Sequence, residues 1–98
     1  MPIKIVWTRQ SREDLREIRA FIAKDAPATA SAFIRRLRNS VDRLRSFPYS
    51  GQVVPELGRD DIREVLRGNY RIIYRILPTR VEILAVYHGA QLLDESEF

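Results

Sequence analysis

The sequence predicts one α+β domain in which a helical hairpin packs on one face of an antiparallel sheet. Residues 62–88 are dense in β-branched and aromatic residues and are interrupted twice by turn-forming residues, which predicts three consecutive strands. Apolar residues recur at three- and four-residue steps through residues 15–47, as in amphipathic helices. With 98 residues and 45% hydrophobic content, the chain can build one core, so we predict a single domain over residues 1–98.

The first elements are a short strand and a helix. Ile3, Ile5 and Trp7 alternate with their neighbours, which predicts a strand. Thr8 then suits a helix N-cap, because its hydroxyl can accept a hydrogen bond from an early helical amide. A capping box over residues 11–14 is the alternative start, about three residues later. The apolar repeat over residues 15–22 predicts the first helix.

A second helix is predicted between two prolines. Pro27 suits a first helical turn, where its missing N–H is not needed. The apolar repeat over residues 30–47 predicts roughly five turns that end before Pro48. Two such helices with a short connection form an antiparallel hairpin, and its apolar stripe must cover a sheet face. Residues 48–61 are predicted to be a loop, with Glu56 at its centre.

The last three strands separate tyrosines from arginines. Gly68-Asn69 and Pro78 mark the two turns between them. Because side chains alternate along a strand, the middle strand places one set toward the core, namely Tyr70, Ile72, Tyr74 and Ile76. Its other face carries Arg71, Ile73 and Arg75. The same alternation in the third strand puts Ile83, Ala85 and Tyr87 on the core side and Glu82, Leu84, Val86 and His88 on the arginine side. We expect that arginine face to be open and to carry the functional site.

The net positive charge and the many arginines favour an anionic partner. The net charge is +4, and all basic residues except Lys4 and Lys24 are arginine, which suits bidentate binding of carboxylate or phosphate. A bias in codon usage is the alternative explanation for the arginine count. The arginines of the second helix are expected to form a solvated face, with an extended anionic contact as the alternative: Arg35, Arg36, Arg38, Arg43 and Arg45.

No cofactor, metal or membrane is expected. The chain has no cysteine, no apolar run of membrane-spanning length, no metal-ligand spacing and no glycine-rich phosphate loop. We therefore expect a cytoplasmic protein.

Short segments spread over nearly the whole chain, in characteristic order, resemble the RelE/ParE superfamily of type II toxin–antitoxin toxins. They are Trp7-Thr8, Asp14-Leu15 with Ile18, residues 47–51 (FPYSG), 55–57 (PEL), Arg63-Glu64, 68–75 (GNYRIIYR) and 83–89 (ILAVYHG). The long helix hairpin makes the chain more ParE-like. The resemblance implies a β-α-α-β-β-β fold, a role in plasmid stabilisation or addiction, and neutralisation by a cognate antitoxin that wraps the toxin.

Two molecular targets remain open from the sequence. The favoured one is DNA gyrase, poisoned without chemistry by this chain, with the arginine-rich surface and residues 90–98 as the contact implied by the resemblance. The alternative is a RelE-like ribosome-dependent mRNA endoribonuclease, in which Glu56 is the base, Arg71 holds the phosphate and His88 is the acid. A toxin fold with weak or lost activity is a third possibility.

Further residues are predicted to contact an anionic partner or the antitoxin. The phosphate or antitoxin contacts are Arg63, Arg67, Arg71 and Arg75. The apolar antitoxin contacts are Ile73, Leu84 and Val86. An acidic, amphipathic antitoxin segment would bury these aliphatic side chains on the open sheet face.

Overall fold

The computed structural model describes residues 2–89, 91 and 93–98, so the parts of the predictions that fall on positions 90 and 92 lie outside it. The two helices are α1 (Arg9–Ala23) and α2 (Pro27–Asn39). The strands are β1 (Lys4–Trp7), β2 (Gln52–Val53), β3 (Ile62–Arg67), β4 (Tyr70–Ile76) and β5 (Arg80–His88). Short 3-10 turns complete the fold, namely η1 (Asp42–Arg45), η2 (Pro48–Ser50) and η3 (Glu95–Glu97).

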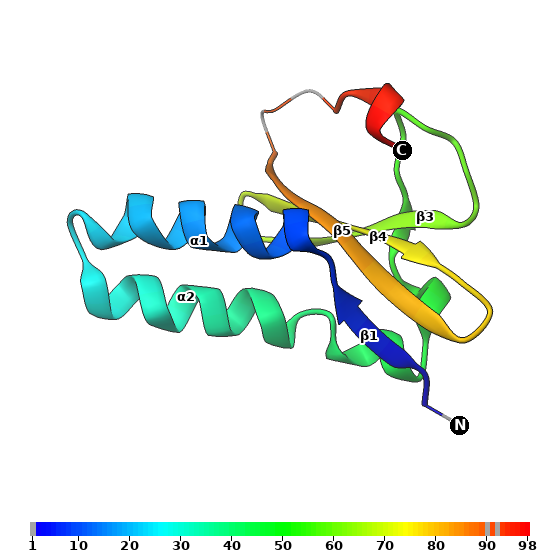
Figure 1. Ribbon diagram of the computed structural model, residues 1–98, viewed down its shortest axis with the longest axis horizontal. Coiled ribbons are helices and arrows are strands. Elements are labelled where there is room, and N and C mark those ends of the chain that lie inside the picture. Colours follow the sequence, from blue (N-terminus) through cyan, green and yellow to red (C-terminus); the bar gives the residue numbers. More distant parts are fainter. Residues whose placement is uncertain (1, 90, 92) are drawn as a thin grey trace.

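The described strands form one sheet in the order β1-β5-β4-β3-β2, and the helix hairpin packs on one face of it. Figure 1 shows the hairpin lying across one side of the sheet, with its tip projecting well beyond the strands. The predicted α+β fold is confirmed. The sheet is mixed rather than antiparallel, because β1 lies alongside β5 and runs parallel to it. The prediction also missed β2, which pairs with β3 from within the expected loop.

The helix boundaries agree with the sequence at their starts. Thr8 caps α1, and its hydroxyl accepts a hydrogen bond from the Ser11 amide, while Pro27 occupies the first turn of α2. The predicted five-turn length of α2 is wrong, because the α-helix ends at Asn39. The chain continues through the 3-10 turn η1, which keeps Val41 and Leu44 buried against the sheet.

The core between the helices and the sheet has a buried tyrosine at one end. The Tyr74 hydroxyl donates to the Pro48 carbonyl oxygen at 2.7 Å and accepts from the Gly51 amide at 3.0 Å. A Cβ at Gly51 would clash with the Tyr74 hydroxyl and the Glu64 backbone oxygen, so only glycine fits here. These contacts anchor the segment of residues 48–51 under β4.

The tyrosines and arginines of β4 lie on opposite faces, as predicted. Tyr70 and Tyr74 pack with the helix-side core, and Arg71 contacts carboxylates on the other face. The expectation that this outer face is open is wrong. A second apolar cluster covers part of it, because residues of the loop and the C-terminal segment pack there: Val54, Ile62, Ile73 and Leu93, with Leu57, Leu84, Tyr87 and Phe98 at the margin.

A β-bulge reverses the predicted faces at the end of β5. Ile73 pairs with Ala85, but the next residue, Tyr74, pairs with Ile83, so Leu84 is the extra residue. Beyond the bulge, the residues predicted for the arginine face turn to the helix side, where Val86 joins the main core and His88 pairs with Tyr70. The predicted faces of Ala85, Val86, Tyr87 and His88 are therefore wrong, whereas Leu84 stays on the outer face.

Candidate functional site

The outer face centres on Arg71, whose guanidinium is held by two carboxylates. Its Nη1 and Nη2 donate to the two oxygens of Glu56 at 2.7 and 2.8 Å, a bidentate pair. Its Nε donates to Glu64 Oε1 at 2.6 Å. The side chain of Arg71 is 12% exposed, so this guanidinium lies largely enclosed between a loop and strand β3.

Glu64 is the residue of this site that the sequence analysis missed. Its side chain is only 3% exposed, and its second oxygen accepts from the Gln52 amide at 3.2 Å. A buried carboxylate needs a cation and hydrogen-bond donors, and Arg71 and Gln52 provide both. The available signal was a glutamate at mid-strand, between Ile62 and Val65, on the same face as Arg71.

The electrostatics of the pair disfavour Glu56 as a general base. The hydrogen bond from Arg71 lowers the pKa of the Glu56 carboxyl below its ordinary value of 4.5. A base that works near neutral pH needs a pKa close to the working pH, which is the opposite direction. Glu56 in turn raises the pKa of Arg71. The pair is thus a stable ion pair in this conformation, and the guanidinium faces carboxylates instead of a free phosphate.

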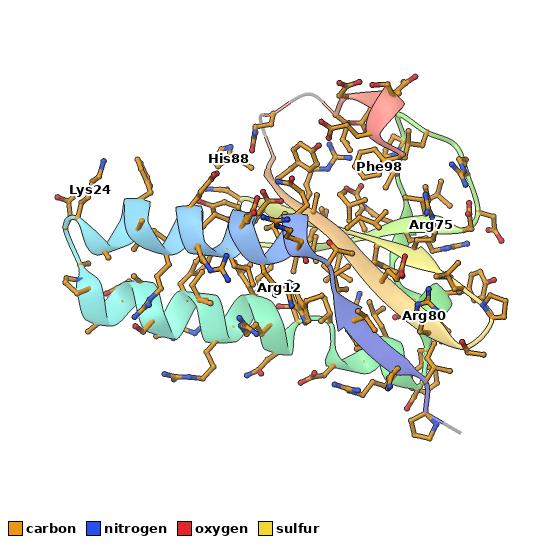
Figure 2. All side chains as sticks on the ribbon, in the orientation of Figure 1. Arg12, Lys24, Arg75, Arg80, His88 and Phe98 are labelled. Atoms are coloured by element: carbon orange, nitrogen blue, oxygen red, sulfur yellow. The ribbon has the colours of Figure 1, made fainter. Side chains whose placement is uncertain are left out.

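His88 lies near this pair but on a different face of its strand. Its ring meets Tyr70 edge-on, with the centroids 5.4 Å apart, and its backbone amide donates to the Gln91 side chain at 2.7 Å. Figure 2 shows His88 above α1, at the far end of the sheet from Arg75. Of the three residues that the nuclease alternative requires, Glu56 and Arg71 are in direct contact, whereas His88 contacts Tyr70 on the helix side of the sheet.

An open pocket of about 500 Å³ connects these residues. Glu56, Glu64, Arg71 and His88 line it, together with the turn between β3 and β4. In that turn Gly68 has a φ of 57°, a conformation that glycine adopts without strain. The pocket is therefore lined by the ion-paired cluster of Arg71 with its two glutamates and by His88.

The other predicted arginine contacts are dispersed over both faces of the sheet, because Arg63 and Arg67 lie opposite the tyrosines of β4 whereas Arg75 shares the face of Arg71. Arg63 stacks over the Tyr49 ring at 5.1 Å and pairs with Asp60 at 2.6 Å. Arg75 donates from Nη2 to the Phe98 backbone oxygen at 3.3 Å, and its Nε is buried with no hydrogen-bond partner among the described residues. Arg67 is exposed at the end of β3. The structure therefore does not gather the four predicted arginines at one place.

The predicted apolar contacts also differ in accessibility. Ile73 is fully buried in the outer cluster and Val86 is 6% exposed in the helix-side core. Leu84 is partly exposed on the outer face. In the conformation described, only Leu84 of the three offers surface to a partner.

The described residues carry no sign of a membrane-spanning helix or a metal site. None of the described helices is long and apolar enough to cross a membrane. Within residues 2–89, 91 and 93–98, no group of three histidine, aspartate or glutamate side chains is arranged to hold a metal ion.

Comparison with known proteins establishes the family. Residues 5–93 match the model of the family described as the ParE toxin of the type II toxin–antitoxin system, parDE. The chain belongs to this ParE toxin family. It is also 38% identical over 91 residues to Y4kP of Sinorhizobium fredii, whose name marks it as a candidate toxin, and the match covers 90% of each chain. The predicted RelE/ParE membership, with a more ParE-like character, is confirmed.

Solved structures of toxin–antitoxin systems share this fold. A chain of the chromosomal ParDE system of P. aeruginosa superposes with a TM-score of 0.76 at 18% identity, covering 88% of this chain and 95% of that one. The RelBE2 toxin–antitoxin complex of Mycobacterium tuberculosis gives a TM-score of 0.58 at 26% identity, covering 90% and 99%. A mutant of the E. coli toxin RelE in the free state gives 0.65 at 14% identity, covering 92% and 86%. The ParE-family toxin thus has the architecture of both branches.

Proposed function

We propose that this ParE-family toxin inhibits growth by poisoning DNA gyrase and that a cognate antitoxin neutralises it. The observation that carries the proposal is the match to the ParE family over residues 5–93. The site geometry supports it, because Arg71 is occupied by Glu56 and Glu64, and the pKa of Glu56 is lowered. A protein that acts by binding does not need a free base at this position.

Purified toxin, gyrase and supercoiled or relaxed plasmid test the target directly. We expect trapped DNA breaks or a loss of supercoiling that depends on toxin concentration. Addition of the antitoxin encoded next to the toxin gene should reverse the effect. If the folded toxin arrests growth yet produces neither trapped breaks nor supercoiling inhibition, gyrase is not the target.

The second candidate is a RelE-like endoribonuclease, and one observation favours it. Glu56, Arg71 and His88 line the same open pocket, although His88 lies on the other face of its strand. Catalysis there would require Glu56 to leave Arg71, so that the guanidinium can bind a phosphate. This movement is feasible because the Glu56 side chain is 30% exposed and lies on a loop.

Two mild variants separate the candidates. Glu56→Gln and His88→Gln each preserve size and polarity, and neither empties the core. A gyrase poison should retain growth arrest in both variants. Loss of growth arrest in His88→Gln, with normal folding and normal antitoxin binding, would instead support the nuclease. Loss of mRNA before DNA-damage signalling, after induction of the wild-type toxin, would support the nuclease as well.

The antitoxin is proposed to contribute an acidic, amphipathic segment to the outer face. Leu84 remains accessible there, and Ile73 becomes available only if the segment displaces the residues that now cover it. Arg67 and Val86 lie on the opposite, helix-side face. Charge complementarity mainly increases the association rate, so we expect that rate to fall as salt rises. An association rate independent of salt would contradict an acidic segment.

A further inference from the structure

A dense cluster of exposed arginines lies on the helix hairpin. A groove of about 420 Å³ runs between α1 and α2, lined by Leu15, Ser31 and Ile34 and by five arginines: Arg12, Arg16, Arg19, Arg35 and Arg38. All five arginines are exposed. Figure 2 shows Arg12 between the two helices, at the end of the hairpin nearest the sheet. We call this surface the arginine groove.

Four arginines of the sheet and its loops are neutralised by the protein's own carboxylates. Ion pairs join Arg59 to Asp61, Arg63 to Asp60, Arg71 to Glu56 and Glu64, and Arg80 to Glu82. Among the residues that the structure describes, no carboxylate pairs with an arginine of the groove. Two of these arginines contact uncharged groups: Arg19 donates to the Ser31 hydroxyl at 3.2 Å, and Arg38 lies 5.7 Å over the Trp7 ring.

Helical spacing explains how the charges separate. At 100° per residue, Arg12, Arg16 and Arg19 fall within about 60° of one another on α1. The acidic residues of the same helix lie on another side, where Asp14 accepts from the Val86 amide and Glu17 lines a different pocket next to His88. The groove therefore has guanidinium groups along both walls and no acidic side chain in its lining.

The floor of the groove argues against an amphipathic protein segment as its occupant. Such a segment gains most of its affinity from burying apolar surface. Leu15 is only 2% exposed and Ile34 is already partly buried, so little apolar side chain is offered. A ligand that gains affinity from charge, through release of its counterions, fits this surface better.

We propose that the arginine groove binds the phosphodiester backbone of nucleic acid, independently of base sequence. Arg12 to Arg19 spans about 10 Å along the helix axis, which matches about three nucleotide steps of one strand. Arginines from α2 add contacts from the other wall, so three to five phosphates are neutralised. The inference goes beyond the proposed toxin function and does not depend on it, because neither gyrase nor antitoxin takes part in the binding.

The test measures binding of the full chain to labelled duplex DNA and to duplex RNA of the same sequence, across a range of salt concentrations. For three to five phosphate contacts, log K should fall against log salt with a slope of about −3 to −4.5. The double variant Arg16→Gln/Arg35→Gln should lose about two units of that slope. The charge-preserving variant Arg16→Lys/Arg35→Lys should keep it.

The matched control is Arg36→Gln/Arg45→Gln, which removes the same charge from two exposed arginines outside the groove. This control should lose much less of the slope than the groove variant. Equal loss in both double variants would show only general attraction and would overturn the proposal, as would absence of binding to both duplexes at low salt. Tighter binding of polyglutamate than of either duplex would assign the groove to an acidic protein segment and overturn it as well. Far-UV circular dichroism confirms that each variant is folded, and a difference between DNA and RNA identifies the source of the phosphodiester.

Discussion

Replacing Arg71 by methionine tests whether its ion pairs hold the fold or serve a reaction. Methionine keeps the apolar stem but leaves the Glu64 carboxylate, 3% exposed, with only the Gln52 amide as a partner. Removing one partner of a buried ion pair costs about 3–5 kcal/mol. Because Gln52 remains and Arg71 is itself 12% exposed, we expect Arg71→Met to lower the free energy of unfolding by about 2–3 kcal/mol.

The two carboxylates should contribute unequally. Glu56 is 30% exposed, so Glu56→Gln should cost about 1 kcal/mol or less, as for other surface pairs. The double variant Glu64→Leu/Arg71→Met removes both buried charges and should recover most of the loss, since a buried pair replaced by apolar residues is often neutral. A double-mutant cycle should give a coupling of about 2 kcal/mol between positions 64 and 71 and under about 1 kcal/mol between 56 and 71.

Urea denaturation followed by far-UV circular dichroism measures each free energy of unfolding. A domain of this size has roughly 5–15 kcal/mol of stability, so the single variants should remain folded enough to measure. Equal couplings for the two carboxylates would refute the reasoning. An Arg71→Met protein as stable as the wild type would refute the reasoning more directly, and would indicate that Arg71 serves function and not stability.

The contacts of Tyr74, Glu56 and Tyr87 give three further predictions. Tyr74→Phe leaves two buried backbone groups unpaired and should cost about 2 kcal/mol, seen as a fall of roughly 10 °C in the melting temperature; an unchanged melt would contradict the two hydrogen bonds. Because Arg71 lowers the pKa of Glu56, that pair stabilises the fold above pH 4.5, the unfolded value, and the gain is lost as pH falls through the lower folded value; Glu56→Gln should lack this part of the acid profile. Burial, followed by the hydrogen bond to Glu97, raises the pKa of Tyr87 from 10.0 to about 12, so its stabilisation is complete below pH 10 and is lost as pH rises through about 12. An ultraviolet titration in which Tyr87→Phe leaves the last tyrosine transition unchanged would contradict this assignment.

Local patterns in the sequence were enough for much of the fold. The alternation along β4 placed Tyr74 and Arg71 on opposite faces, because the period of a strand is fixed at two residues. Thr8 and Pro27 marked the helix starts, since capping depends on residues within one turn. Resemblance over the whole chain gave the toxin family, which the family match confirms.

Features that join distant segments could not be obtained in this way. The bulge at Leu84 depends on how β5 pairs with β4, and it moved His88 to the helix side. The cover over Ile73 comes from residues 54–62 and Leu93, which no periodicity connects to β4. The resemblance placed Glu56 and Arg71 in one candidate site, but no local pattern indicated that they form an ion pair, because they lie 15 positions apart.

The amino-acid order by itself determined where both helices begin, where β1, β3, β4 and β5 lie, which side of β4 is apolar, and to which toxin family the chain belongs. The tertiary structure alone decided which arginines are available to a partner. Charge is a property of composition, but neutralisation depends on which carboxylates the fold brings within contact. On the sheet face those carboxylates are present, and in the arginine groove of the hairpin they are absent among the described residues.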